Sequence, residues 1–238
     1  MTQIYQEIVN AKKQNEKLLA ILLDPEKLKI ADIQALCLKI NRTKATHILV
    51  GGSTFNGNYL DELLIEIKKH SKLPILLFPG DYKQISDEAD GILLLSLLSG
   101  RNPDYLIEHQ INAVPLLRKT KLEIIPTAYL LIESGSQTAV ERVSLTKPMD
   151  RSDNEYVAQT AKAGEFMGNK LVYLEAGSGA KIAVSLEMIK VVSTTVQVPL
   201  IVGGGIRTKE AIEKTFQAGA DMIVIGTAFE TNNSFFDL

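Results

Sequence analysis

The sequence of 238 residues contains one cysteine, Cys37, and three histidines. One cysteine excludes an internal disulfide and a cysteine-rich metal site, and it suits a reducing compartment. The histidines are scattered and form no pattern of metal ligands. The formal net charge of −2 leaves no broad basic surface for nucleic acid or for an anionic membrane. Any anionic ligand must therefore be held by a local arrangement of groups.

Long apolar runs are also missing. No run reaches the ~18 apolar residues of a membrane helix. The N-terminal segment MTQIYQEIVNAKKQNEK is too polar for a signal peptide, so we expect a cytoplasmic protein. Hydrophobic residues make up 45% of the chain, and its length fits one α/β barrel of roughly 250 residues. We therefore expect residues 1–238 to form a single domain.

Short apolar segments alternate with amphipathic segments, which favours a parallel α/β fold. We predict strands at residues 18–23, 46–50, 74–78, 91–98, 123–132, 171–174, 200–202 and 222–225. Segment 81–90 is too short and polar for a long helix, so the crossover after the third strand should be abbreviated. The prediction is a (β/α)₈ TIM barrel, with an open doubly wound sheet as the alternative.

Four finer expectations follow from the same pattern. Residues 4–17 should form a helix packed outside the first strand. Pro126 should cause a break or bulge in the fifth strand, because proline cannot donate to a ladder. Segment 133–153 should be an irregular loop, functional or mobile. The tail 231–238 is too short for a full last helix.

Three predicted strands end in glycine. They lie in LVYLEAGSGA (Leu171–Ala180), PLIVGGGIR (Pro199–Arg207) and DMIVIGTA (Asp221–Ala228). Glycines let the backbone approach an oxyanion, and the helix that follows adds its positive N-terminal end. We interpret the three endings as one phosphate cradle. The alternative is that the glycines serve only tight turns.

Two side chains beside this cradle are candidates for chemistry. Glu175 could accept a proton from a substrate hydroxyl, although a carboxylate at a strand end is often only solvated or ion-paired. Tyr173 could fill the barrel, but its phenol more naturally reaches the polar mouth.

Oxygen ligands follow the first two strands. Asp24 ends the first strand, and Ser53 follows the second. Mg²⁺ prefers oxygen ligands and is typically held by one or two carboxylates, waters and substrate phosphates. The sequence therefore allows a magnesium site, although Asp-Pro also makes an ordinary turn. His47 lies near the start of its strand, and we expect a structural role for it.

With these residues assembled, the chain resembles the geranylgeranylglyceryl phosphate synthases, which are related to bacterial heptaprenylglyceryl phosphate synthases. Five motifs in family order carry the resemblance over nearly the whole chain: LLDPEK (Leu22–Lys27), VGGST (Val50–Thr54), YLEAGSGA (Tyr173–Ala180), VGGGIR (Val202–Arg207) and IGTAFE (Ile225–Glu230). Some members have lysine where this chain has Leu22, so it looks closer to the archaeal and Bacteroidetes-type branch. Lys27 and Lys181 are candidates to replace the missing cation.

The resemblance implies a magnesium-dependent prenyl transfer. The C3 hydroxyl of sn-glycerol 1-phosphate attacks C1 of geranylgeranyl diphosphate, which forms an ether and releases diphosphate. Asp24 and Ser53 match the magnesium positions, and Glu175 and Asp24 match the catalytic groups. Matching positions for glycerol phosphate are Tyr173, Leu174, Glu175, Ala176, Gly177, Ser178, Gly179, Gly204, Gly205, Gly226 and Thr227.

Further implications concern the prenyl chain and the partners. An apolar groove is needed for the chain, and segments 93–98 and 81–90 could line it. The resemblance implies a homo-oligomer, and a lipid product makes peripheral membrane contact an expectation. Chain-length preference stays open.

The alternatives are another phosphate-binding barrel enzyme, of the aldolase or isomerase type, and a non-catalytic binding barrel. An aldolase needs a lysine at the carboxyl end of a strand, and Lys170 stands at the start of one. A sugar-phosphate isomerase needs a second acid after the fifth strand, where Glu133 lies well beyond. A non-catalytic binding barrel would be expected to lack Asp24 or Glu175, and both are present.

Overall fold

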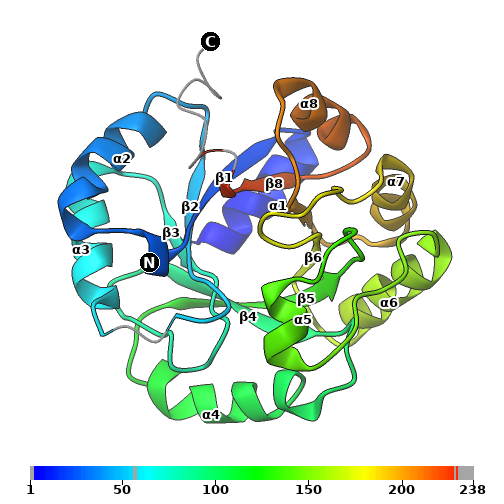
Figure 1. The fold of residues 1–238 in the computed structure, drawn as a ribbon, viewed down its shortest axis with the longest axis horizontal. Coiled ribbons are helices and arrows are strands. Elements are labelled where there is room, and N and C mark those ends of the chain that lie inside the picture. The colour runs from blue at the N-terminus through cyan, green and yellow to red at the C-terminus, as the bar shows by residue number, and fades with distance from the viewer. Residues whose placement is uncertain (1–2, 56–57, 228, 230–238) are drawn as a thin grey trace.

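The computed structural model describes residues 3–55, 58–227 and 229. Eight parallel strands close into a barrel in chain order, so the predicted TIM barrel is confirmed (Figure 1). The strands are β1 (Leu18–Leu23), β2 (His47–Val50), β3 (Ile75–Leu77), β4 (Gly91–Leu97), β5 (Glu123–Leu131), β6 (Leu171–Glu175), β7 (Leu200–Gly203) and β8 (Met222–Ile225). Each strand is mostly buried, because a barrel covers both faces of its sheet.

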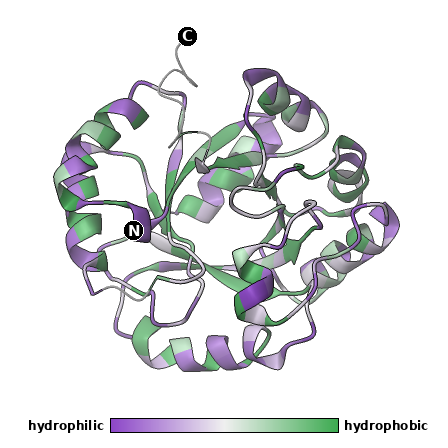
Figure 2. Cartoon of the chain, in the orientation of Figure 1, coloured by the Kyte–Doolittle hydropathy of each residue, from purple (hydrophilic) through white to green (hydrophobic). Residues whose placement is uncertain are grey.

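Helices surround the strands in an outer ring, except α5, which lies inside this ring beside β5 (Figure 1). They are α2 (Ile33–Ile40), α3 (Leu60–His70), α4 (Glu108–Leu117), α5 (Ala139–Ser144), α6 (Asn154–Phe166), α7 (Leu186–Thr195) and α8 (Lys209–Gln217). Most of them mix polar and apolar side chains, whereas the strands are predominantly hydrophobic (Figure 2). Between β3 and β4 the described chain forms no helix, which confirms the abbreviated crossover. None of the described helices is long and apolar enough to cross a bilayer.

Helix α1 (Ile4–Gln14) does not pack outside β1, so that expectation is wrong. Its Ile4 and Ile8 are fully buried and belong to the same cluster as the residues that fill the barrel. At the start of β5, Glu123 accepts hydrogen bonds from the backbone N–H groups of Ile4 and Tyr5, at 2.6 and 3.1 Å. Helix α1 therefore covers the N-terminal end of the barrel. In Figure 1, which looks along the barrel, α1 is seen behind the strands and inside the ring of helices. An apolar helical stripe does not say which apolar surface it meets.

Pro126 produces no break in β5. The register with β4 runs through the pair Leu94–Pro126 without interruption. The Pro126 carbonyl accepts from the Lys170 N–H, so this residue faces β6. Strand β6 pairs with β5 only from Leu171, opposite Thr127. The missing proline N–H therefore lies where no partner strand has begun, and no ladder hydrogen bond is lost.

Segment 133–153 is more regular than expected, because it contains α5. A capping box starts this helix: Thr138 Oγ1 accepts from the Glu141 N–H at 3.2 Å, and the Glu141 carboxylate accepts from the Thr138 N–H at 2.7 Å. Its sequence, a threonine followed three residues later by glutamate, is visible in TAVE. The expectation for residues 231–238 lies outside the described residues.

Candidate active site

A cavity of about 440 Å³ opens at the carboxyl ends of the strands. All eight strands, or the loops that follow them, contribute side chains or backbone to its walls. This is the end at which barrels of this kind carry their chemistry. The cavity has a polar part around β6, β7, β8 and the loops after β1 and β2, and a more apolar part around β4, α4 and α5.

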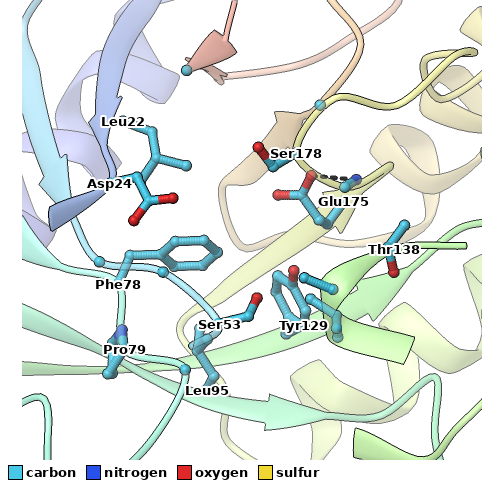
Figure 3. Close-up of a pocket in the computed structure, with 18 of the residues that line it drawn as sticks. Leu22, Asp24, Ser53, Phe78, Pro79, Leu95, Tyr129, Thr138, Glu175 and Ser178 are labelled. Carbon is cyan, nitrogen blue, oxygen red and sulfur yellow. Dashed lines mark hydrogen bonds between the residues drawn. The ribbon is translucent and has the colours of Figure 1, made fainter. Parts of the chain in front are cut away.

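Glu175 is the last residue of β6 and stands at the polar part. Its side chain is 5% exposed, and its Oε1 accepts a 2.6 Å hydrogen bond from the Gly177 N–H (Figure 3). It forms no ion pair with a described residue. Burial raises the pKa of the Glu175 carboxyl, and the Gly177 amide and the Tyr173 hydroxyl, which lower it, do not offset that effect. A carboxylate with a raised pKa and no cation is suited to accept a proton.

Tyr173, two residues earlier, points to the same interior. It is fully buried, and its hydroxyl has no hydrogen-bond partner of ordinary geometry among the described residues. A Cβ at Gly203 would overlap this hydroxyl, so glycine is required where β7 passes the ring. An orphaned buried hydroxyl beside a carboxylate is a group that a polar ligand can satisfy.

The glycines after β7 are needed for more than a tight turn. Gly204 has φ +82°, and a Cβ there would lie 2.6 Å from the Glu175 carboxylate and 2.7 Å from the Gly177 carbonyl oxygen. Gly205 has φ +72° and lies against Ala183. Gly226 differs, because a Cβ there would meet only Leu22, at 3.6 Å. Its small size leaves space in the cavity and is not required by its backbone.

The structure brings most of the expected cradle together. Of the positions expected to bind glycerol phosphate, those that line the cavity are Tyr173, Glu175, Gly177, Ser178, Gly179, Gly204, Gly205, Gly226 and Thr227. The hydroxyls of Ser178 and Thr227 lie 3.4 Å apart, so the loops after β6 and β8 meet. Leu174 and Ala176 are fully buried in the layer between barrel and helices. Side chains alternate along a strand, so these two face away from the cavity.

Asp24 and Ser53 both line the cavity, opposite Glu175 (Figure 3). Asp24 caps a short 3₁₀ turn by accepting from the Glu26 N–H at 3.2 Å, and Lys27 Nζ lies 3.5 Å from its other oxygen. A Cβ at Gly52 would lie 2.9 Å from Asp24 Oδ1, so glycine keeps space at the carboxylate. No three His, Cys, Asp or Glu side chains gather in a metal-binding group within the described residues.

This donor set fits magnesium and not a closed structural metal site. One carboxylate and one hydroxyl leave most positions for water and substrate oxygens, as Mg²⁺ requires. Lys27 also lines the cavity, whereas Lys181 is exposed and does not. Of the two candidates to replace the cation missing at Leu22, only Lys27 is therefore in place.

The apolar part of the cavity extends away from Glu175. Leu94 and Leu95 of β4 line it, with Tyr82 and Ile85 from the abbreviated crossover. Helices α4 and α5 complete it with residues that include Tyr105, His109, Ala113, Val140 and Val143. Because no helix follows β3, this side of the barrel mouth stays open to an extended apolar group. Within the expected segment 93–98, Leu94, Leu95 and Leu97 line the cavity, whereas Leu93, Ser96 and Leu98 do not.

Several lining residues were missed from the sequence, and three of them lie close to Glu175 or to the loop after β6. Phe78 directly follows β3, Tyr129 lies within β5, and Thr138 begins α5. Thr138 limits the loop after β6, because a Cβ at Gly177 would lie 2.5 Å from its methyl group. The signal for Phe78 was its position at a strand end, before Pro79 and Gly80. Tyr129 had no signal, because strand periodicity does not distinguish the inner from the outer face of a barrel.

The fold and the site define the class, an α/β-barrel enzyme that works at the carboxyl ends of its strands. The chain belongs to the PcrB family, whose model matches residues 11–237. It is 56% identical to a protein of Flavobacterium johnsoniae named geranylgeranylglyceryl phosphate synthase, over 100% of this chain and 98% of that protein. An archaeal relative of that name, from Korarchaeum cryptofilum, is 40% identical over 92% of this chain and 90% of its own length.

A solved structure agrees with these relatives. The crystal structure of (S)-3-O-geranylgeranylglyceryl phosphate synthase from Thermoplasma acidophilum, in complex with sn-glycerol-1-phosphate, superimposes with a TM-score of 0.93. The two chains are 34% identical, and the match covers 100% of this chain and 95% of that one. The resemblance expected from the five motifs is therefore confirmed.

Proposed function

We propose that this protein is a prenyltransferase that joins sn-glycerol 1-phosphate to geranylgeranyl diphosphate through an ether bond. The C3 oxygen of glycerol phosphate forms a bond to C1 of the prenyl chain, and the C1–O bond to diphosphate breaks. The observation that carries the proposal is that one cavity contains the glycine cradle, the buried Glu175 carboxylate and the apolar part lined by β4, α4 and α5, which we call the apolar arm. Its two parts match a small phosphorylated acceptor and a prenyl chain.

The phosphate of the acceptor occupies the cradle formed by the loops after β6, β7 and β8. Backbone amides of Gly204, Gly205 and Gly226 and the hydroxyls of Ser178 and Thr227 are the donors that can reach it. The acceptor hydroxyl then lies near Glu175 and Tyr173. Glu175 accepts the hydroxyl proton, and its raised pKa favours that transfer. Tyr173, whose hydroxyl has no hydrogen-bond partner of ordinary geometry among the described residues, holds the glycerol in place.

Asp24 and Ser53 hold Mg²⁺ in this proposal, together with oxygens of the diphosphate. When bound, the ion neutralises the leaving diphosphate, which an allylic C–O bond needs in order to ionise. Asp24 and Glu175 stand on opposite sides of the polar part (Figure 3). This arrangement keeps the leaving group and the acceptor apart, with C1 between them.

The alternative barrel activities receive no support from the site. Lys170 stands before β6, and its Nζ lies 5.0 Å from the ring centroid of Tyr5 in α1. It is therefore at the N-terminal end of the barrel, where no Schiff base with a substrate in the cavity can form. Glu133 is exposed and does not line the cavity, so it supplies no second acid for an isomerase.

We also propose that the protein is cytoplasmic, that residues 1–238 work as one domain, and that it forms a homo-oligomer that touches membranes peripherally. Exposed apolar side chains support both contacts. Phe166 and Met167 at the end of α6 are 79% and 71% exposed and suit a second copy. Ile107 and Ile111, 55% and 56% exposed beside the apolar arm, suit a lipid surface. Light scattering and vesicle flotation test the two contacts separately.

The direct test offers the purified protein radiolabelled sn-glycerol 1-phosphate with prenyl diphosphates of fifteen, twenty and thirty-five carbons, with and without Mg²⁺. We expect an ether-linked product with the twenty-carbon donor in the presence of Mg²⁺. The sn-glycerol 3-phosphate enantiomer is the matched control acceptor and should react far more slowly. No ether product with any donor would contradict the proposed function.

A further inference from the structure

Three aromatic rings form the floor of the cavity between the two carboxylates. Phe78 and Tyr173 stack, with ring centroids 5.3 Å apart and planes 20° apart. Tyr129 meets both rings at an angle, with centroid distances of 5.8 Å to Phe78 and 5.5 Å to Tyr173. All three line the cavity. We call Phe78, Tyr129 and Tyr173 the aromatic floor.

Phe78 is the member of the aromatic floor that the cavity exposes most. It is half-buried, whereas Tyr173 is fully buried and Tyr129 is 5% exposed. Figure 3 shows its ring between Asp24 on one side and Tyr129 and Glu175 on the other. Its backbone N–H donates to the Val50 carbonyl oxygen at 2.9 Å, and Gly51 must be glycine because a Cβ there would overlap the Phe78 carbonyl oxygen. A large, partly exposed aromatic side chain between two carboxylates needs a reason beyond core packing.

The chemistry supplies such a reason. When the C1–O bond of an allylic diphosphate breaks, both electrons leave with the diphosphate oxygen. Positive charge then spreads over C1 and C3 of the prenyl chain until the acceptor oxygen bonds to C1 and its proton passes to Glu175. The negative π-face of an aromatic ring attracts such a charge, and the attraction is stronger in a desolvated site.

We propose that Phe78 is a catalytic residue whose ring face stabilises the positive charge that develops on the allylic end of the prenyl donor. Tyr173 stacks on Phe78 and supports the ring at that position, and Tyr129 contacts the Phe78 ring at an angle of 59°. Leu94 and Leu95 offer apolar contact to the chain but no π-face. This inference rests on the proposed function, since it needs an allylic diphosphate in the cavity.

Graded fluorination of the ring tests the proposal. Replacement of Phe78 by 4-fluoro-, 3,5-difluoro- and 3,4,5-trifluorophenylalanine withdraws π-electrons with little change of shape. We expect kcat to fall stepwise with the number of fluorine atoms, by about 10-fold in total. KM for the prenyl donor should stay within about twofold, because the ground-state donor carries no charge at C1. Phe78→Leu should lose at least as much kcat, with a folded circular dichroism spectrum.

The matched control is the same series at Phe216 of α8, which packs outside the barrel and does not line the cavity. That series should leave kcat unchanged. If the wild-type protein forms the ether but kcat is the same across the Phe78 series, the role of the ring is overturned and the proposed function stays intact. Absence of ether product from the wild-type protein would overturn both. The two failures are therefore distinguishable.

Discussion

The two ends of this barrel each bury a carboxylate, and they treat it in opposite ways. At the N-terminal end, Asp221 is 6% exposed, and its Oδ2 accepts from Lys12 Nζ and from the Leu200 N–H, both at 2.8 Å. At the carboxyl end, Glu175 is 5% exposed, accepts from the Gly177 N–H and forms no ion pair with any residue that the structure describes. The same degree of burial therefore gives a satisfied ion pair at one end and an unpaired, raised-pKa carboxyl at the other.

The difference extends to the surrounding backbone and packing. Helix α1 covers the N-terminal end, and Glu123 caps its first amides. The carboxyl end is hollow, and several of its glycines have left-handed φ values, such as Gly177 at +99° and Gly204 at +82°. Contacts at the N-terminal end stabilise the fold. At the carboxyl end, the positive-φ glycines and the buried Glu175 carboxylate lower the free energy of unfolding but keep groups reactive. Substitutions at the two ends should therefore separate stability from activity.

The largest effect on activity is expected at Asp24. Asp24→Asn should lower kcat about 1,000-fold or more, because the proposed magnesium site loses its carboxylate. The amide can still cap the 3₁₀ turn, so the melting temperature should change little. Steady-state kinetics over a range of Mg²⁺ concentrations measures the loss.

Asp81→Asn is the matched control for this substitution. Asp81 also lines the cavity, but its Oδ1 accepts from the Lys83 N–H and has no place in the proposed site. It should keep near-normal turnover. If Asp24→Asn also turns over normally at ordinary Mg²⁺, Asp24 is not a ligand.

Glu175→Gln should lower kcat at least ~100-fold, since an amide cannot accept the hydroxyl proton. Affinity for sn-glycerol 1-phosphate should persist, because the amide oxygen can still accept from Gly177. A rise in KM alone, with kcat retained, would instead make Glu175 a binding residue. In the wild-type protein, kcat should fall on the acid side at a pH above the ordinary glutamate range, since the pKa is raised.

The same substitution should increase stability, which sharpens the comparison. A raised folded-state pKa means that the contribution of Glu175 to stability is fully present below its ordinary pKa. That contribution is lost as the pH rises through the raised value. At pH 8 the ionised wild-type carboxyl costs folding free energy that Gln does not. Urea unfolding should give Glu175→Gln the higher free energy of unfolding at pH 8, with the difference vanishing toward acid.

Asp221→Asn should show the opposite behaviour. It leaves Lys12 without its partner and should lower the free energy of unfolding by about 1 to 2 kcal/mol, a modest value because Lys12 is partly exposed. The kcat of the folded protein should not change, since Asp221 lies at the far end of the barrel. Urea unfolding and kinetics on one preparation test both statements. A large loss of kcat without loss of stability would contradict the division between the ends.

The smallest effect is expected at Gly226. Gly226→Ala adds one methyl group that meets no atom closer than 3.6 Å, so the fold should tolerate it. If phosphate lies against this backbone, KM for sn-glycerol 1-phosphate should rise about 10-fold while KM for the prenyl donor stays constant. Gly168→Ala is a control outside the cavity. Gly168 has a φ of +94°, and an added Cβ would meet no non-adjacent described residue within 4 Å, so this variant reports backbone strain alone. If KM for sn-glycerol 1-phosphate is the same in Gly226→Ala and in the wild type, the phosphate binds elsewhere.

Local sequence alone determined the fold class and much of the candidate site. Eight apolar segments between amphipathic ones predicted the barrel, and the polar segment 81–90 predicted the missing crossover helix. Strand ends rich in glycine, with Asp24 and Glu175 among them, predicted which loops meet. These signals are local, because hydrophobic periodicity, strand ends and turn residues can each be recognised from a few neighbouring residues.

Only the tertiary structure decided which buried surfaces meet. It placed α1 across the end of the barrel, let Pro126 fall where no partner strand had begun, and put Phe78 and Tyr129 beside Glu175. It also paired Asp221 with Lys12, whereas Glu175 has no ion pair within the described part of the chain. The physical reason is that burial and electrostatic environment are sums over residues distant in the chain, so two similar acids acquire different protonation behaviour only once the barrel has closed.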